Sequence, residues 1–209
     1  MREERLKRIK DVVLKRQFDL TVVLENVHDP HNIGAVLRTC DSVGIHEIFV
    51  LNSDPELFNE KLEVGGKSTS GSRKWVDINF FTNRESCFQT VKKVYKHVIG
   101  TSLTTNSKNL YDFDFTQSTA IVFGNEKEGI SNETLSYCDS NLWIPQIGMV
   151  QSLNISVACA VVLYEAGRQR NFTPIKNSFN LLQKQQNLLE DYIQRHEAGQ
   201  KRKISKRID

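Results

Sequence analysis

Three short polar clusters contain the residue types that could carry out chemistry in this sequence. They hold Asn32 and Arg38, then Glu126, then Ser152 and Asn154. A guanidinium binds a phosphate or a carboxylate through paired hydrogen bonds, and a carboxylate can direct or accept a proton. Each residue alone also has a plainer role open to it, as a helix cap, a surface ion pair or part of a turn. Their meaning therefore depends on whether the fold brings the clusters together.

Each cluster lies beside a short apolar run that we predict to be a buried strand. The expected strands are 20–24, 45–51, 97–102, 119–123 and 142–144, and the helices between them are 33–43, 83–96 and 131–138. Strands that alternate with helices predict an α/β fold, with a parallel sheet and right-handed crossovers. Ligands of such folds bind beyond the carboxyl ends of the strands, so the clusters are expected to meet at that edge.

The third cluster opens the most hydrophobic helix that the sequence predicts, 152–170. Ser152 stands just before an apolar run and is a good N-cap. The helix is apolar on nearly all sides, which indicates burial in a core or at a subunit interface. Its first amides have no partner within the helix and can hold a ligand. A capped core helix after a loop is the simpler interpretation.

The two ends of the chain are basic, whereas its body is acidic. Residues 1–17 and 195–209 each carry a formal charge of +4, which leaves −5 for residues 18–194. This distribution favours contact with a polyanion, although charged ends also serve solubility alone.

Both ends are predicted to be helical. The helix at 2–17 has an apolar face and basic flanks, and the helix at 173–197 begins at Thr173-Pro174, a cap followed by proline. The apolar faces are predicted to contain Leu6, Ile9 and Val13 in the first helix and Leu182, Leu189 and Ile193 in the second.

Several classes of protein are disfavoured. The four cysteines, Cys40, Cys87, Cys138 and Cys159, contain no CxxC and are expected to be buried thiols in a reducing compartment. No secretory signal and no apolar run of about 20 residues is present, so we expect a cytoplasmic protein without a membrane segment.

Other motifs fail on spacing. The glycine-rich, basic stretch 61–74 matches neither a P-loop nor a dinucleotide fingerprint, although it could contact phosphate. His28 and His31 lack further ligands nearby in the sequence, which disfavours a metal site. No GxSxG elbow is present, so hydrolase chemistry is not expected.

Taken in order, the clusters resemble the three motifs of the SPOUT class of RNA methyltransferases. The motifs are Asn32-x-Gly34-x-x-x-Arg38, Phe123-Gly124-x-Glu126-x-x-Gly129 and Ile144-Pro145-x-x-Gly148-x-x-x-Ser152-Leu153-Asn154. The similarity extends over roughly residues 5–172. Three motifs in order and at proper spacing are far more specific than a single glycine pattern.

The resemblance implies a fold and an activity. It implies a parallel sheet whose C-terminal part forms a deep trefoil knot, a homodimer, and three regions: a basic helical extension at 1–17, a methyltransferase domain at 18–172, and a helix with a basic tail at 173–209. It implies methyl transfer from S-adenosylmethionine to the ribose 2′-hydroxyl of guanosine 18 in the D-loop of tRNA.

Three alternatives stay open. Relatives that act on ribosomal RNA often carry a separate N-terminal RNA-binding domain, whereas about 17 residues precede the first strand here. Relatives that modify the wobble ribose usually lack long extensions at both ends. An RNA-binding homologue without catalysis is a different class, and the intact motifs argue against it.

The resemblance also implies roles for particular residues. Arg38 would be central to catalysis, with Asn32, Glu126, Ser152 and Asn154 around it. A guanidinium is effectively always protonated, so we expect Arg38 to clamp the phosphate beside the target ribose, with that phosphate helping to accept the proton. Glu126 would orient Arg38 or, alternatively, act as the base. Which subunit supplies Arg38 to a given cofactor stays open.

Cofactor and RNA contacts are implied in the same way, and no metal is needed. The residues expected at the cofactor are Thr101, Ser102, Leu103, Gly124, Ile144, Met149 and Leu153. Those expected to contact tRNA are Arg5, Arg8, Arg16, His31, Arg168 and Arg170. Arg168 and Arg170 would equally suit the C-terminus of a helix through its dipole.

Overall fold

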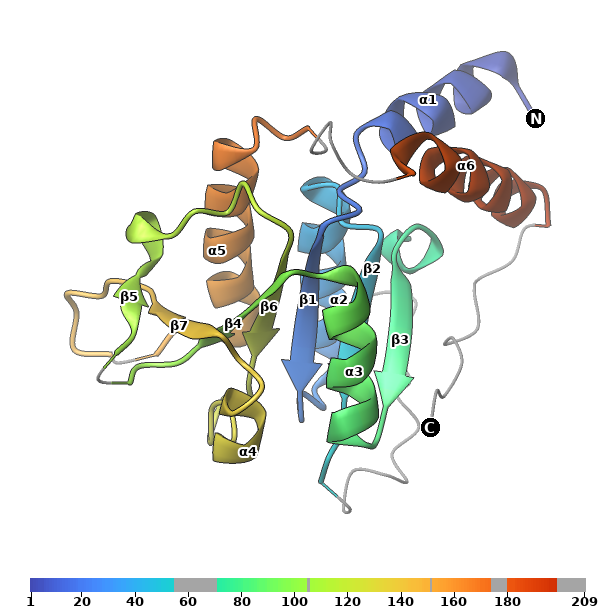
Figure 1. Ribbon diagram of the computed structural model, residues 1–209. Helices are drawn as coiled ribbons and strands as arrows, with labels where there is room; N and C mark the ends of the chain where they lie inside the picture. The colour runs from blue at the N-terminus through green and yellow to red at the C-terminus, as the bar shows by residue number, and fades with distance from the viewer. Residues whose placement is uncertain (55–70, 105, 151, 174–179, 199–209) are drawn as a thin grey trace.

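The fold is built on one parallel sheet. The computed structural model describes residues 1–54, 71–104, 106–150, 152–173 and 180–198. Within them a 7-stranded sheet has the order β3-β2-β1-β6-β4-β7-β5, and every pair of neighbours is parallel. The strands are β1 Leu20–Glu25, β2 Glu47–Leu51, β3 Asp77–Phe81, β4 His97–Thr101, β5 Lys108–Asn109, β6 Thr119–Phe123 and β7 Ser140–Trp143. The predicted parallel sheet is confirmed (Figure 1).

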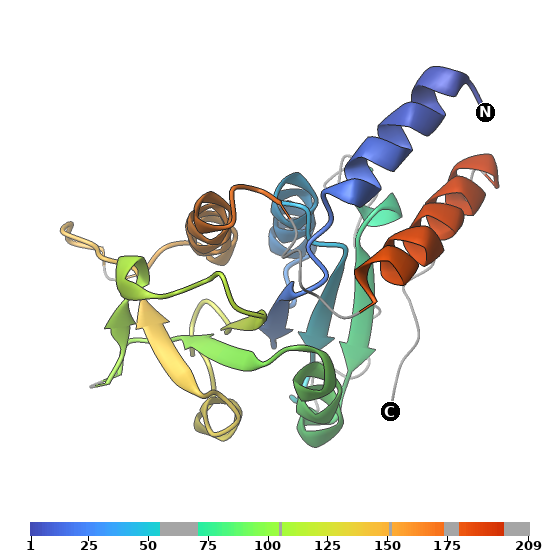
Figure 2. The same cartoon turned by 45° about the horizontal axis from the view of Figure 1, so that its top comes forward.

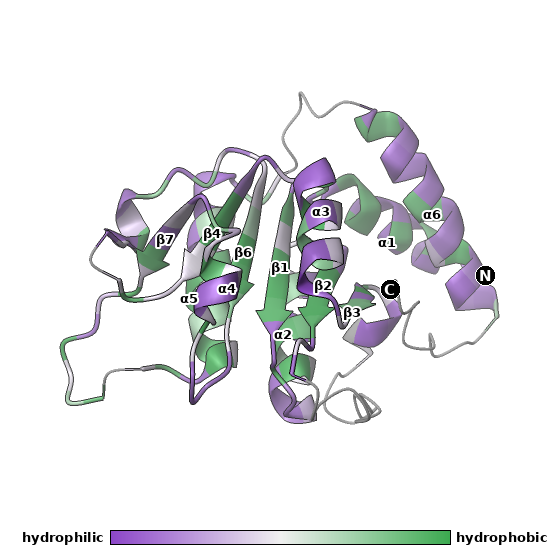
Figure 3. Ribbon diagram, turned by 60° about the horizontal axis from the view of Figure 1, so that its bottom comes forward, coloured by the Kyte–Doolittle hydropathy of each residue, from purple (hydrophilic) through white to green (hydrophobic). Residues whose placement is uncertain are grey.

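Two strands, β3 and β5, have no counterpart in the sequence prediction. β3 reads DINFF, in which polar residues interrupt the apolar ones, and β5 has only 2 residues. Both lie at the edges of the sheet, whereas β1 and β6 lie in its middle and are buried at every position. Central strands need continuous apolar sequence, but edge strands do not, so only the central ones are evident from sequence. Figure 3 shows the hydrophobic colour along β1 and β6.

Helices cover both faces of the sheet. They are α1 Glu3–Leu14, α2 Pro30–Ser42, α3 Arg84–Val94, α4 Asn132–Leu135, α5 Ile155–Gln169 and α6 Leu181–Glu197. The apolar sides of α2 and α5 form one core with one face of β1 and β6, and α3 forms a second core with the other face. Figure 2 shows this three-layer arrangement, with α2 and α5 on one side and α3 and α4 on the other.

The helices α1 and α6 pair beyond the amino ends of the strands (Figure 1). Ile9 and Val13 of α1 are buried against Leu188 and Tyr192 of α6, as predicted for the first helix. The apolar face predicted for the last helix is correct at Leu189, which packs against this cluster, but wrong at Leu182, which is 82% exposed. The helix begins at Leu181, not at Thr173, and residues 174–179 lie outside the described part of the chain.

Three further expectations can be compared with the structure. The second helix starts at Pro30, three residues earlier than predicted, because Asp29 caps it by accepting a hydrogen bond from the His31 amide. Cys40, Cys87 and Cys159 are buried free thiols, whereas Cys138 is half-buried. In the loop predicted at 61–74, residues 61–70 are outside the described residues, and Ser72–Lys74 form a 3₁₀ turn.

No helix among the described residues is long and apolar enough to cross a membrane.

Candidate active site

A chain of hydrogen bonds joins the three motifs at the carboxyl edge of the sheet. Asn32 Nδ2 donates to Glu126 Oε1 at 2.5 Å, and Asn154 Nδ2 donates to Asn32 Oδ1 at 3.1 Å. These residues lie 94 and 122 positions apart in the sequence. Asn32 therefore links a carboxylate on one loop to an amide on another, and the structure brings together one residue from each motif.

The two amides are held by helix ends. Asn32 lies in the first turn of α2, which Asp29 caps. Asn154 is itself the N-cap of α5, since its Oδ1 accepts from the Ser156 amide at 2.9 Å. The sequence predicts Ser152 as the cap, which is two residues too early. Ser152 is exposed and has no hydrogen-bond partner among the described residues.

Glycines shape the loop that presents Glu126. The amide and carbonyl of Asn125 pair with those of Gly129 at 3.0 and 2.8 Å, which closes a tight turn around Glu126. Gly129 has a φ of 71°, in the left-handed region that favours glycine. A Cβ on Gly124 would lie 2.1 Å from the Gly129 carbonyl carbon, so no side chain fits there. The glycines of this motif are thus required by the close return of the backbone.

Arg38 is exposed on α2, with no hydrogen bond or ion pair to any described residue. Within one chain the Glu126 carboxylate bonds to Asn32, and the expectation that Glu126 orients Arg38 stays a prediction. No donor of the Arg38 guanidinium is used by a described residue, so these donors can bind a ligand.

The residues predicted to bind the cofactor gather at the same edge. They follow three neighbouring strands: Thr101, Ser102 and Leu103 after β4, Gly124 after β6, and Ile144, Met149 and Leu153 after β7. The strand ends are joined, since Thr101 Oγ1 donates to Val122 O at 2.9 Å and the Ser102 amide to Leu142 O at 3.1 Å.

This group leaves apolar side chains uncovered. Leu103 is 80% exposed and Met149 is 99% exposed, and Leu153 is 37% exposed. Isolated exposed apolar residues are ordinary, but here they stand beside turn backbone at strand ends. That combination fits a ligand with an apolar ring and polar edges, such as a nucleoside.

The residues predicted to bind RNA separate into two groups. Arg5, Arg8, His31 and Arg168 are exposed. Arg168 also forms a bidentate ion pair with Glu165, with both N–O distances at 2.8 Å. Hydrogen bonds from Arg168 lower the pKa of the Glu165 carboxyl below its usual range.

Arg16 and Arg170 are buried, which corrects the prediction that they contact RNA. Arg16 donates to Asp41 Oδ1 at 2.6 Å and to Ile45 O at 3.0 Å. Arg170 donates to Asp19 Oδ1 at 2.8 Å and to Phe115 O at 2.6 Å. Both guanidinium groups hold loops together at the amino edge of the sheet, and neither can reach a phosphate outside.

Sequence reasoning missed two residues that support the site, Glu25 and Asn26. Glu25 ends β1 and is 1% exposed, and Asn26 has a φ of 52°. A carboxylate that closes a run of apolar residues was the available signal, since a buried charge needs partners. Among the described residues, no group of three His, Cys, Asp or Glu side chains could hold a metal ion.

A parallel sheet with a polar site at its carboxyl edge and glycine-shaped turns defines an α/β protein that binds its ligand at that edge. The SpoU rRNA Methylase family matches residues 19–164, and the chain belongs to that family.

Its relatives include tRNA (guanosine(18)-2′-O)-methyltransferases. The one from Thermus thermophilus is 44% identical over 170 residues, which is 80% of this chain and 84% of that protein. The one from Escherichia coli K12 is 38% identical and covers 81% of this chain and 72% of its own.

Solved structures show the same fold. A TrmH/SpoU tRNA modifying enzyme from A. aeolicus aligns with a TM-score of 0.80 at 35% identity, covering 94% of this chain and 97% of its own. The SpoU methyltransferase AviRb from Streptomyces viridochromogenes, solved in complex with AdoMet, has a TM-score of 0.63 at 28% identity and covers 78% and 62%.

Proposed function

We propose that this protein transfers a methyl group from S-adenosylmethionine to the ribose 2′-hydroxyl of guanosine 18 in the D-loop of tRNA. Relatives named tRNA (guanosine(18)-2′-O)-methyltransferases share 38 to 44% of their residues with it over most of the chain. The observation that carries the proposal is the hydrogen-bonded series Glu126–Asn32–Asn154, because it joins one residue from each of the three motifs.

S-adenosylmethionine would be held by the loops after β4, β6 and β7. Thr101, Ser102 and Gly124 offer hydroxyl and backbone groups, and Leu103, Ile144, Met149 and Leu153 offer apolar contact for an adenine ring. The cofactor supplies a methyl group on a positively charged sulfur, which becomes a neutral thioether when the 2′-oxygen takes the methyl carbon. No metal is needed, since the leaving group is already activated.

Catalysis then requires positioning of the ribose and removal of one proton. An in-line attack needs the two reacting atoms about 3–3.5 Å apart. Arg38 binds the phosphate beside the target ribose, and that phosphate helps to accept the 2′-hydroxyl proton. Glu126 fixes Asn32, while Asn154 and Ser152 border the pocket. Glu126 is the alternative proton acceptor.

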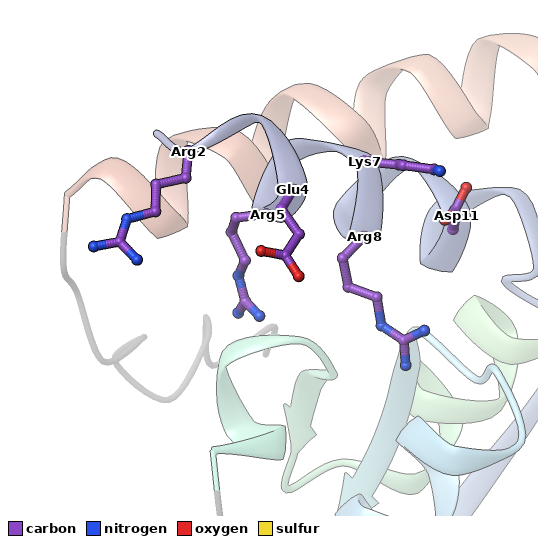
Figure 4. Close-up of a pocket in the computed structure, with 6 residues that line it drawn as sticks. All are labelled: Arg2, Glu4, Arg5, Lys7, Arg8 and Asp11. Carbon is purple, nitrogen blue, oxygen red and sulfur yellow. The ribbon is translucent and has the colours of Figure 1, made fainter.

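The tRNA would lie across exposed basic residues outside the site. Arg5 and Arg8 extend from α1 on the same side, as Figure 4 shows, next to a hollow of about 420 Å³ lined by α1 residues. Together with His31 and Arg168 they would bind phosphates, which sets register and makes affinity salt-dependent. The extensions at 1–17 and 173–209 thus add RNA contacts to the domain at 18–172.

A homodimer, a trefoil knot and a cytoplasmic location complete the proposal. Val157 and Tyr164 of α5 are 47% and 50% exposed, and Ile147 and Val150 before it are 106% and 69% exposed. A second copy would cover such apolar surface. The knot would involve the segment after β7 and α5. A reducing compartment that contains tRNA suits the free thiols.

The test is methyl transfer from labelled S-adenosylmethionine to defined RNAs. We expect label in a tRNA transcript, resistance to alkaline cleavage after nucleotide 18, and no label when that nucleotide is 2′-deoxyguanosine. Ribosomal RNA from cells that lack the enzyme is the comparison substrate. Label in ribosomal RNA or at the wobble ribose instead would overturn the choice of substrate, and failure to transfer to any RNA would overturn the activity.

A further inference from the structure

A buried polar network lies under the loop that carries Glu126. Its centre is the Glu25 carboxylate, whose oxygens accept hydrogen bonds from the Ser131 amide at 2.9 Å, from Ser131 Oγ at 2.7 Å and from Thr134 Oγ1 at 2.5 Å. Arg84 lies 3.4 Å from Glu25 and balances its charge. The carboxylate is 1% exposed, so these partners replace water. The network fixes the far end of the loop, where α4 begins.

The near end of the loop is fixed by the next residue, Asn26. Its carbonyl oxygen accepts a hydrogen bond from Asn125 Nδ2 at 2.9 Å. Its own side-chain oxygen accepts from the Ser53 amide at 2.8 Å, which ties it to the end of β2. Asn26 reaches this position with a φ of 52°, a conformation that asparagine adopts more readily than most residues.

We propose that Glu25, Asn26 and Asn125 are positioning residues that set the Glu126 carboxylate against Asn32, a role that rests on the proposed function. The two successive residues Glu25 and Asn26 hold the loop at Ser131 and at Asn125, on either side of Glu126. Glu126 has no other described tether than the Asn32 bond. A site must be held within a fraction of an ångström to be productive, and small displacements reduce rates strongly.

The first test is a double-mutant cycle between Asn125→Ala and Glu126→Ala. Asn125→Ala removes the bond to Asn26 and should lower kcat about tenfold, with KM for tRNA and cofactor changed less than about twofold. The second member of the cycle should be read in Glu126→Ala, because a glutamine oxygen could still accept from Asn32 Nδ2. In the Glu126→Ala background Asn125→Ala should have no further effect, because the side chain that it positions is absent. Asn125→Asp keeps the oxygen that accepts from the Lys127 amide at 2.8 Å and should resemble Asn125→Ala.

The control is Glu133→Gln, an exposed carboxylate on α4 that should leave kcat unchanged. Equal losses in both backgrounds, a loss in KM alone, or unchanged kcat in Asn125→Ala would overturn the proposal. A fully active Glu126→Ala variant would overturn it too.

A second readout does not depend on activity. Hydrogen exchange should show that Asn125→Ala lowers the protection of the Gly129 amide, and that Glu25→Gln lowers that of Ser131, while β1 amides keep theirs in both. If the wild-type protein methylates no RNA, the proposed function fails and the positioning role is judged on exchange. Unchanged protection in both variants would then overturn the role.

Discussion

Exposed and buried arginines have opposite roles in this protein. Arg38, in the second half of α2, is exposed and has no partner among the described residues. At the amino end of the sheet, Arg16 and Arg170 are 0% and 4% exposed and bond to carboxylates and backbone carbonyls. The position of a charged residue in a motif therefore does not reveal its role, whereas its unused hydrogen-bond donors do.

The physical reason lies in desolvation. A buried guanidinium loses its water and must find protein acceptors, so its donors are committed to the fold. An exposed guanidinium keeps water and can exchange it for phosphate at little cost. The buried arginines at the amino end of this sheet thus contribute to stability, whereas the donors of Arg38 remain available to a ligand.

The largest expected effect is at Arg38. Arg38→Ala should lower kcat at least about 100-fold, since it removes the phosphate clamp, and should leave cofactor affinity intact. Initial rates and calorimetric titration with S-adenosylhomocysteine measure the two quantities. Arg38→Lys is the matched variant and should recover only part of the rate, because it lacks the planar fork. Near-normal turnover in Arg38→Ala would contradict the functional role that distinguishes Arg38 from the buried arginines.

Arg170→Met tests the stabilising role of a buried arginine at the amino end of the sheet. It leaves the Asp19 carboxylate, in a residue that is 7% exposed, without its ion-pair partner, and should lower the free energy of unfolding by about 3–5 kcal/mol. Arg168→Met, two residues earlier with a side chain that is 71% exposed, should lower the free energy of unfolding far less. Urea unfolding compares them. A stable Arg170→Met protein with weakened tRNA binding would restore the RNA role.

Arg8 tests whether an exposed arginine of α1 contacts RNA. Arg8→Ala should weaken tRNA binding about threefold to tenfold and reduce the slope of log K against log salt by about 1, since one phosphate contact is lost. Filter binding at several salt concentrations measures both. Lys92→Ala removes the same charge from α3 and should leave the slope unchanged. Equal slopes for all three proteins would exclude α1 from the RNA surface.

His46 should give the smallest effect, on the stability of the amino end. Burial lowers the pKa of its imidazole below 6.5, and this outweighs the Glu47 carboxylate 3.9 Å away. A folded-state pKa below the unfolded value means that the stabilisation is full above pH 6.5 and is lost as the pH falls below it. His46→Asn should show a weaker fall in unfolding free energy between pH 7.5 and 5.5 by chemical denaturation. Parallel pH profiles would exclude His46 as the cause.

Much of the fold follows from local patterns. Continuous apolar runs and helical periodicity are local patterns that do not depend on neighbouring elements. They predict the central strands β1 and β6 and the helices α2, α3 and α5. The edge strand β3 was not, since its polar residues become a strand only through pairing with β2. The start of α6 was also missed, because a Thr-Pro pair suits a helix start but does not require one.

The residue types of the site, their order and their place after strands could be predicted from the amino-acid sequence. The three-dimensional structure was needed to show that Asn32 bonds Glu126, that Asn154 caps α5, and that Arg170 is buried while Arg168 is not. Contacts between residues 94 or 122 positions apart depend on how the loops fold back, and burial depends on every neighbour in space. The local spacing of residues predicts neither long-range contacts nor burial. For this reason two of the six residues predicted to contact RNA are instead buried and stabilise the fold.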